Sequence, residues 1–267
     1  MRSTPSPRLG ALALGLALFI GASRARAAPA WIFRGLTLPR GDVALDLGLG
    51  LAHEPMIDDN RSVTGTGMNL EIAFGVSHEL ELGLRTGARF GSDGEVTQAD
   101  RYGRPFDTET YGTNGDPLAN PELRLLWAAA QGSIVKLGLE LRAYLPIENR
   151  SRFGFMFALP LRLRLGAVRI DSGVYVPVIL RDPTQSAISF PLHIWLQASR
   201  TLWLGPLLGV LIANSGGGRN QYPLGFGLGL ALAGAIDLRT WILFPDISGD
   251  AAARRFGAGV ALQIRFE

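Results

Sequence analysis

Cysteine is absent from this chain of 267 residues. Its absence excludes a disulfide framework, a thiolate metal site and a lipid anchor on cysteine. Long apolar runs are also missing, because no stretch after the first 27 residues approaches the length of about 18 residues that a membrane-spanning helix needs. Inner-membrane helices are therefore excluded, and any membrane insertion must be carried by strands.

An excess of charge of one sign is missing as well, once the N-terminus is read as a targeting segment. Arg2 and Arg8 precede the apolar run 9–21, and Ala25-Arg26-Ala27 has the small-x-small pattern of a signal-peptidase site. This pattern is typical of a secretory signal peptide cleaved near Ala27. Four of the 26 basic residues and none of the 23 acidic residues lie in residues 1–27, so the formal net charge of +3 becomes −1 in the mature chain. Nucleic-acid binding by a basic patch is not supported.

What the sequence does contain is alternation of apolar and polar residues. Residues 67–90 hold two such alternations, separated only by Ser77-His78-Glu79. Their apolar face consists of Met68, Leu70, Ile72, Phe74 and Val76, then Leu80, Leu82, Leu84, Thr86, Ala88 and Phe90. A period of two indicates a strand with one apolar face, and about ten residues is the length of a tilted strand across a bilayer. The stretch predicts two strands with lipid outside and a polar lumen inside.

The same alternation predicts twelve strands, at residues 42–52, 67–76, 80–90, 121–129, 135–145, 153–165, 169–180, 187–199, 201–212, 222–232, 235–244 and 255–266. Residues 201–212 are apolar on both faces, so their outward face is left open. An open sheet edge would leave backbone groups unpaired in hydrocarbon, so the strands must close. We predict an all-β fold, a twelve-stranded antiparallel up-and-down transmembrane β-barrel over 42–267, behind a signal peptide at 1–27 and an irregular periplasmic lead-in at 28–41.

The connections alternate between short and long. Short turns are expected near residues 78, 131, 167, 200 and 234, and longer connections at 53–66, 91–120, 146–152, 181–186, 213–221 and 245–254. Bacterial outer-membrane barrels have short periplasmic turns, long extracellular loops and both termini in the periplasm. Aromatic residues near the strand ends predict two interfacial girdles, an outer one with Phe90, Phe153, Phe190, Phe244 and Phe256 and an inner one with Phe74, Trp127, Trp203 and Phe266. We therefore expect the bacterial outer membrane as the location.

Three short motifs resemble those of known outer-membrane proteins. The end of the chain, ALQIRFE, resembles the C-terminal signal that the barrel-assembly machinery recognises, although Glu267 follows the aromatic residue. Residues 37–45 (TLPRGDVAL) and 74–84 (FGVSHELELGL) resemble the family of outer-membrane barrels described as meta-pathway phenol-degradation proteins. That family has a Leu-Pro-basic-Gly lead-in and an aromatic-Gly-x-Ser/Thr hairpin followed by Leu-Glu-Leu. The resemblance implies a twelve-stranded barrel that passes small hydrophobic compounds, and it implies no catalytic residue.

Charged residues of both signs fall on the polar faces of the predicted strands. We expect the lumen to be lined by Asp46, Glu71, Glu81, Arg85, Arg89, Glu122, Arg124, Lys136, Glu140, Arg142, Arg162, Arg164, Arg169, Asp171, His193, Asp237, Arg239, Arg255 and Arg265. Such charges either line a water-filled passage or close it as ion pairs. Because like charges directly opposite are unfavourable, we predict the cross-strand pairs Glu71–Arg85, Arg164–Asp171, Glu122–Arg142 and Arg124–Glu140.

The function predicted from these observations is a narrow channel for passive passage of a small, hydrophobic or aromatic solute, with no enzymatic activity and no cofactor. A closed structural barrel and a soluble lipocalin-type barrel with its apolar face inward are the alternatives. A lipid hydrolase would need an outward Ser-His pair, and His53, His78 and His193 match no such motif. Asp58-Asp59-Asn60 and the acidic loop 91–120 lack calcium-loop spacing. Loop 91–120 is expected either to fold over the mouth of the basic lumen or to be a mobile surface loop without a role in access. The expected partners are outer-membrane lipid, the assembly machinery and the solute.

Overall fold

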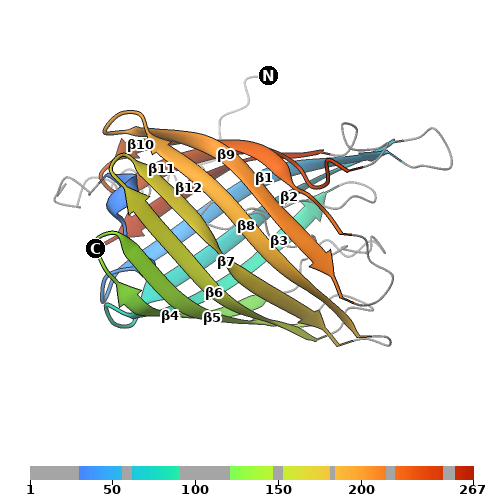
Figure 1. Cartoon of the computed structure of the whole chain (residues 1–267), viewed down its shortest axis with the longest axis horizontal. Coiled ribbons are helices and arrows are strands. Elements are labelled where there is room, and N and C mark those ends of the chain that lie inside the picture. Colours follow the sequence, from blue (N-terminus) through green and yellow to red (C-terminus); the bar gives the residue numbers. More distant parts are fainter. Residues whose placement is uncertain are drawn as a thin grey trace, which may run out of the picture.

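Twelve strands form one closed antiparallel barrel, in which every strand pairs with its neighbours in sequence and β1 pairs with β12 (Figure 1). The computed structural model describes residues 30–55, 62–90, 121–146, 153–180, 184–214, 220–248 and 256–267. Its elements are η1 (Trp31–Phe33), β1 (Val43–Pro55), β2 (Ser62–Gly75), β3 (Leu80–Phe90), β4 (Glu122–Gln131), β5 (Val135–Tyr144), β6 (Gly154–Leu165), β7 (Val168–Ile179), β8 (Gln185–Gln197), β9 (Leu202–Ala213), β10 (Leu224–Ala233), β11 (Ile236–Phe244) and β12 (Phe256–Phe266). The predicted fold class is confirmed. The signal peptide at 1–27, Asp58-Asp59-Asn60 and the loop 91–120 lie outside the described residues.

Most strand bounds lie within two residues of the predicted ones, and the largest difference is at β1 and β2. These strands reach Pro55 and Ser62, which pair with each other, so the connection is shorter than the predicted 53–66. The apolar alternation ends earlier than the pairing does, because residues 62–67 (SVTGTG) are mostly small or β-branched. Backbone hydrogen bonding continues there without a lipid-facing pattern to reveal it.

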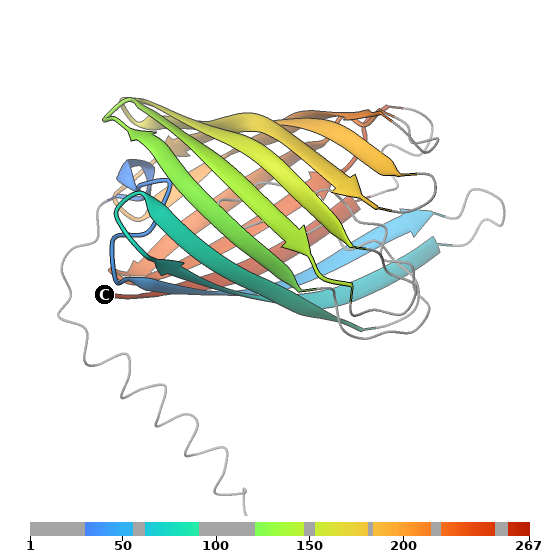
Figure 2. The same ribbon diagram turned by 90° about the horizontal axis from the view of Figure 1, so that it is seen from below.

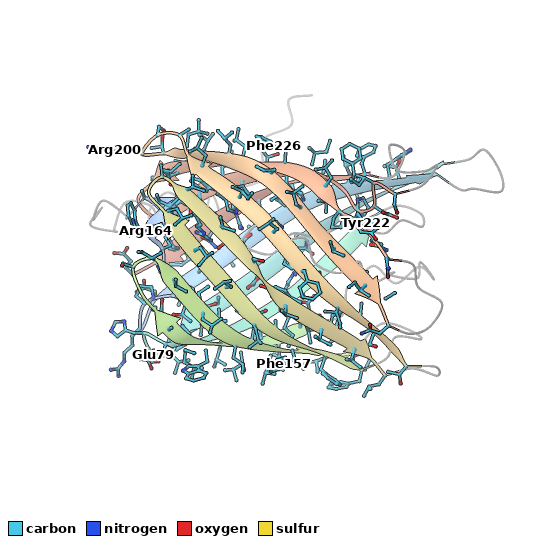
Figure 3. All side chains as sticks on the ribbon, viewed as in Figure 1. Glu79, Phe157, Arg164, Arg200, Tyr222 and Phe226 are labelled. Atoms are coloured by element: carbon cyan, nitrogen blue, oxygen red, sulfur yellow. The ribbon has the colours of Figure 1, made fainter. Side chains whose placement is uncertain are left out.

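The outer surface of the barrel is apolar. Leu49, Leu82 and Leu123 are 59%, 47% and 48% exposed, and Phe157 and Phe226 point away from the wall in the middle of the barrel (Figure 3). A soluble monomer rarely exposes contiguous apolar patches of more than a few hundred Å². The apolar faces therefore point outward, which excludes the lipocalin-type alternative.

The inner wall has two chemically different sides. The side formed by β2–β7 carries buried charged residues, among them Glu81, Arg124 and Asp171. The side formed by β8–β11 is built mainly from Trp195, Trp203, Leu207 and Leu243, all buried, together with glycines, and β11 adds the buried charges of Asp237 and Arg239. On β9 the inward residues are Trp203, Gly205 and Leu207, which settles the face that the sequence leaves open.

One prediction about inward and outward residues needs correction. Trp203 was predicted to belong to the inner aromatic girdle, but it is 1% exposed and points into the barrel. By contrast, Trp127 and Phe74 are exposed on the outer surface. Trp203 differs because the strand is apolar on both faces, so alternation alone does not distinguish a lipid-facing ring from a lumen-facing one.

The predicted cross-strand register is correct at one hairpin and wrong at two. Glu71 pairs with Arg85, as predicted. Across the β6–β7 turn, however, Arg164 lies opposite Arg169, because the chain reverses in two residues at Gly166, whose φ is +62°. A positive φ at this position is what a two-residue hairpin turn requires. The turn is therefore centred one residue earlier than predicted, and each partner shifts by two.

The β4–β5 hairpin shifts in the opposite direction. Glu122 lies opposite Tyr144 and Arg124 opposite Arg142, so the predicted pairs Glu122–Arg142 and Arg124–Glu140 are wrong. The pairing of β4 with β5 shifts between Trp127 and Ala130. A bulge of this kind inserts an extra residue into one strand and leaves no mark in the apolar pattern.

Candidate functional site: a charged lumen crossed by the N-terminal segment

Residues 30–42, here called the N-terminal segment, enter the barrel at one end instead of lying outside it. The helix η1 lies at the end of the barrel where the C-terminus and the short turns are (Figures 1 and 2). Trp31, Ile32 and Leu36 are each at most 5% exposed. The sequence predicts only an irregular lead-in here. The signal that could have revealed more is the apolar run Trp31-Ile32-Phe33, which would be costly to leave in water.

Aromatic contacts hold the tip of the N-terminal segment against β8 and β9. The ring of Trp31 stacks on Trp203 with 5.0 Å between centroids and an interplanar angle of 6°. It also meets the ring of Trp195 edge to face at 5.3 Å. On β7, the guanidinium of Arg169 lies 3.6 Å from the centroid of the Trp31 ring. Stacked, edge-to-face and cation–π geometries are all attractive, so Trp31 is the anchor of the segment.

Cationic side chains of β5, β6 and β7 bind the backbone carbonyls of the same segment. Arg169 donates to the Trp31 carbonyl at 3.1 Å. Lys136 donates to the carbonyls of Phe33 and Arg34 at 3.2 and 2.7 Å. Arg162 donates to the carbonyls of Arg34 and Gly35 at 3.1 and 2.7 Å. Hydrogen bonds from charged donors are stronger than neutral ones, so these bonds fix the path of the segment.

The segment spans the barrel from one wall to the other. The side chain of Arg34 forms a two-pronged ion pair with Asp237 on β11. Farther along, the Leu38 N–H donates to the carboxylate of Glu81 on β3 at 2.7 Å. The segment leaves the barrel beside β2, where the Gly41 N–H donates to the Gly75 carbonyl at 2.8 Å. The lumen is thus crossed at the end where the short turns lie.

A network of ion pairs covers the inner wall from β2 to β5. Arg124 lies between Glu71 and Glu81, at 3.1 and 2.5 Å. Arg142 contacts Glu140 at 2.6 Å and Glu122 at 3.0 Å. Opposite charges still meet even though the predicted register of β4 and β5 is wrong, because arginine is long enough to reach diagonal neighbours.

The network continues across β3 and β4, where Arg85 lies 3.7 Å from Glu122. Its residues are all buried, at 0–6% exposure. A buried charge whose partner is removed is strongly unfavourable. These residues therefore act as a connected set.

The remaining predicted site residues lie in three places. Asp171 pairs with Arg162 and Arg169 at 2.6 Å each, and Arg239 pairs with Asp46. His193 is fully buried, with its ring 6.3 Å from that of Trp195. The side chains of Arg89 and Arg255 lie outside the described residues.

At the turn end, Arg164 donates to the Ser133 carbonyl at 2.8 Å and lies over the ring of Phe33. Arg265 pairs with Asp237 at 3.2 Å. Arg164 is therefore drawn toward the N-terminal segment, and Arg265 shares the carboxylate that Arg34 binds.

A cavity of about 190 Å³ adjoins the N-terminal segment at the turn end, with Trp31, Arg34, Arg162, Arg169, Gln263 and Arg265 in its lining. Asp42 also lines it, just before β1. Partial burial and the nearby charge of Glu267 raise the pKa of Asp42, and Arg265 opposes the shift. No group of three or more metal-binding side chains is found within the described ranges. In the same ranges, no helix is long and apolar enough to cross a membrane.

Comparisons with solved structures find the same architecture at low sequence identity. An outer membrane channel from Pseudomonas putida F1 superimposes with a TM-score of 0.59 and 11% identity, over 86% of this chain and 97% of the other. The NanC porin gives 0.58 and 5%, over 82% and 98%. The KdgM porin gives 0.55 and 9%, over 84% and 99%. At such identities the likeness establishes the fold, a twelve-stranded barrel of the outer-membrane type.

Neither a protein-family model nor a curated protein matches this chain.

Proposed function

We propose that this protein is a channel of the bacterial outer membrane that passes small solutes by diffusion. One observation carries the proposal: the barrel is apolar outside, with Leu49 and Leu82 about half exposed, and charged inside, with Glu81 and Glu140 fully buried. Only lipid makes such an outer surface favourable, and a closed barrel is the strand architecture that lipid permits. The fold shared with the outer membrane channel and the two porins supports the same conclusion.

The N-terminal segment sets how open the channel is. It crosses the lumen between Asp237 on β11 and Glu81 on β3, and Trp31 fills the space beside Trp195 and Trp203. A solute must pass this segment at the turn end. Conductance is therefore governed by whether the segment stays docked.

The aromatic side of the lumen supports a solute with an apolar ring. A Cβ atom at Gly229 would lie 2.1 Å from the Trp203 ring, and one at Gly259 would lie 2.4 Å from the Trp241 ring. These rings therefore lie flat against the wall over residues without side chains. Flat aromatic faces are good contact surfaces for planar apolar groups, and the face of Trp203 becomes available to them when the stacked ring of Trp31 leaves it. The resemblance of residues 37–45 and 74–84 to phenol-degradation barrels favours the same solute class.

The experiment is single-channel conductance of the refolded full chain in a planar bilayer, compared with Trp31→Ala. Loss of the Trp31 contacts should undock the segment, so the variant should conduct several times better than the wild type. Trp127→Ala is the matched control, because Trp127 is 47% exposed on the outer wall. It should leave conductance unchanged. In liposome swelling with phenol-sized neutral solutes, Trp31→Ala should likewise give a faster rate than the wild type, and Trp127→Ala should give the wild-type rate.

A closed structural barrel is the second candidate, and the ion-pair network favours it. Arg85, Arg124 and Arg142 pair with glutamates across β2–β5, which would hold that side of the lumen together. The two candidates differ in one outcome. If neither the wild type nor Trp31→Ala conducts, while both show the heat-dependent gel shift of a folded barrel, the structural role is correct.

Lipid hydrolysis is not favoured by the histidine positions. His193 is buried inside the barrel, whereas a lipid hydrolase needs its nucleophile and base at the lipid-facing surface. The Nδ1 atom of His53 lies 2.9 Å from the Thr64 hydroxyl at the rim. His78 lies in the exposed turn after β2. We therefore assign no catalytic role.

Export and assembly belong to the same proposal. We infer that residues 1–27 direct export and that cleavage near Ala27 frees the segment that enters the lumen. The C-terminal strand β12 closes the barrel against β1, from Val43↔Phe266 to His53↔Phe256. The exposed ring of Phe266 is the feature that the assembly machinery would bind.

A further inference from the structure

Four cations surround the N-terminal segment where it passes β5, β6 and β7: Lys136, Arg162, Arg164 and Arg169, here called the cation cradle. Three of them donate to backbone carbonyls of residues 31–35, and the fourth lies 4.6 Å from the ring centroid of Phe33. The segment thus offers the cradle neutral oxygens and a ring face. Residues 30–38, the part of the segment that contacts the cradle, contain no acidic residue, and the carboxylates of Asp42 and Glu267 line the adjoining cavity.

The charges of the cradle are not balanced by carboxylates. Arg162 and Arg169 share Asp171, at 2.6 Å each. Lys136 and Arg164 form no ion pair with any residue in the described ranges. Asp237, on the opposite wall, binds Arg34 and Arg265. Within the described ranges, Lys136 and Arg164 thus have no carboxylate partner, Arg162 and Arg169 share that of Asp171, and backbone carbonyl groups accept hydrogen bonds from all four cations.

We propose that the cation cradle is a binding site for small organic carboxylates, and that the N-terminal segment occupies it in competition with them. A carboxylate is a stronger acceptor than a carbonyl, and the arginine fork matches its two oxygens. Binding exchanges hydrogen bonds from the cradle to carbonyls 31–35 for bonds to the anion. The freed segment leaves the lumen.

A path to the cradle exists while the segment is docked. The cavity of about 190 Å³ is lined by Arg162 and Arg169 of the cradle and by Trp31. A cavity of about 150 Å³ is enough to hold benzene. A monocyclic aromatic acid such as benzoate therefore fits beside the cradle before the segment moves, with its ring near Trp31 and its carboxylate toward the arginines.

Because the anion and the N-terminal segment compete for the cation cradle, anion binding and segment release promote each other. An anion that binds the undocked form more tightly than the docked form must shift the segment toward release, and anything that releases the segment must raise anion affinity by the same factor. Benzamide has the same ring without the charge. It should therefore enter the cavity without displacing the segment.

The first test uses Leu36→Cys, which introduces the only thiol into a chain without cysteine. Leu36 is 4% exposed when the segment is docked, so a maleimide reagent reaches residue 36 after release. Benzoate at fixed ionic strength should raise the labelling rate about fivefold or more, within the usual range of coupling between sites. Benzamide should leave the rate unchanged. Equal rates with benzoate and benzamide overturn the proposal.

The second test measures ion selectivity in the Trp31→Ala background, where the segment is undocked and the cradle is intact. Its reversal potential in a KCl gradient should favour chloride. Adding Lys136→Gln and Arg164→Gln should shift it toward potassium. Adding Arg200→Gln, in the exposed turn at the same end of the barrel (Figure 3), should not. An unchanged reversal potential after neutralisation of Lys136 and Arg164 counts against the cradle.

Of the two tests, only the second depends on the proposed channel function. The labelling test needs no current, so faster labelling in benzoate with no conductance in any variant would support the carboxylate site and overturn the channel. Conductance in Trp31→Ala without an effect of benzoate on labelling would support the channel and overturn the site.

Discussion

At the scale of single residues, the outward leucines test which face of the wall meets lipid. Leu82 lies on β3 and is 47% exposed. Leu82→Arg should lower the free energy of unfolding in phospholipid vesicles by about 2–4 kcal/mol, the cost of an arginine near the bilayer centre of a barrel. A urea titration of the refolded protein measures it. Leu82→Met is the control and should cost far less. Equal stability of the two variants would mean that Leu82 does not face lipid.

Glycines opposite tryptophans make a second residue-scale prediction. A Cβ atom at Gly229 would lie 2.1 Å from the Trp203 ring, whereas one at Gly48 would lie 3.8 Å from its nearest neighbour. Gly229→Ala must therefore displace the ring on which Trp31 stacks. It should lower the unfolding free energy by about 1–3 kcal/mol, as overpacking does. Gly48→Ala should be nearly neutral in the same titration. A larger loss for Gly48→Ala would contradict the flat packing of the ring.

Alternation predicts which way most residues point, and its failures have a physical cause. It places Leu82 outside and Glu81 inside, because charge and hydrocarbon separate on the two faces of one strand. It fails for Trp203, because an inward tryptophan over a glycine is as apolar as an outward one. Contacts of this kind depend on a neighbouring strand, which the sequence of β9 alone does not contain.

At the scale of elements, the ion pairs between β2, β3 and β4 decide the stability of the charged wall. Arg124 is 5% exposed and lies between Glu71 and Glu81. Arg124→Met should cost about 3–5 kcal/mol, because it leaves two buried carboxylates without this partner. Replacing both glutamates by glutamine in the same variant should restore part of the loss. Equilibrium unfolding of the single and triple variants measures the difference. No recovery in the triple variant would mean that packing, not charge, holds Arg124.

The register of elements is harder to predict than their existence. Opposite charges predict Glu71↔Arg85 correctly, since the turn 76–79 carries no irregularity that shifts the pairing. The same argument fails for β4 and β5, where the register shift lies between Trp127 and Ala130. Long arginine side chains pair diagonally, so charge complementarity is satisfied in more than one register. Turn geometry therefore determines the register, and the long charged side chains then pair within that register.

At the scale of the whole molecule, the two ends of the described chain have different roles in the barrel. Strand β12 closes the sheet against β1, and the residues just before β1 cross the lumen. The closed sheet is predictable, because lipid permits no open edge. The position of the N-terminal segment is not, because it follows from contacts with nine strands, β2 to β9 and β11, that meet only after the barrel has formed. Its docking site exists only in the finished fold.

Comparing assembly in cells with refolding in detergent distinguishes recognition of the last strand from closure of the barrel. Phe266 pairs with Val43 at the end of β12 and is 38% exposed. Phe266→Ala removes an outward ring at the terminus without removing a backbone hydrogen bond. The purified variant should therefore refold in detergent about as well as the wild type, whereas its amount in the outer membrane of expressing cells should fall severalfold.

Phe226→Ala is the matched control for this experiment, because Phe226 is an outward ring, 44% exposed, in the middle of the wall on β10 (Figure 3). It loses a similar apolar area but lies far from the terminus. Heat-dependent gel migration measures folding in both settings. If both variants lose the same fraction in cells, the loss reflects buried apolar area in lipid. If only Phe266→Ala fails in cells, the terminal ring is read during assembly, because the folded barrel itself tolerates its absence.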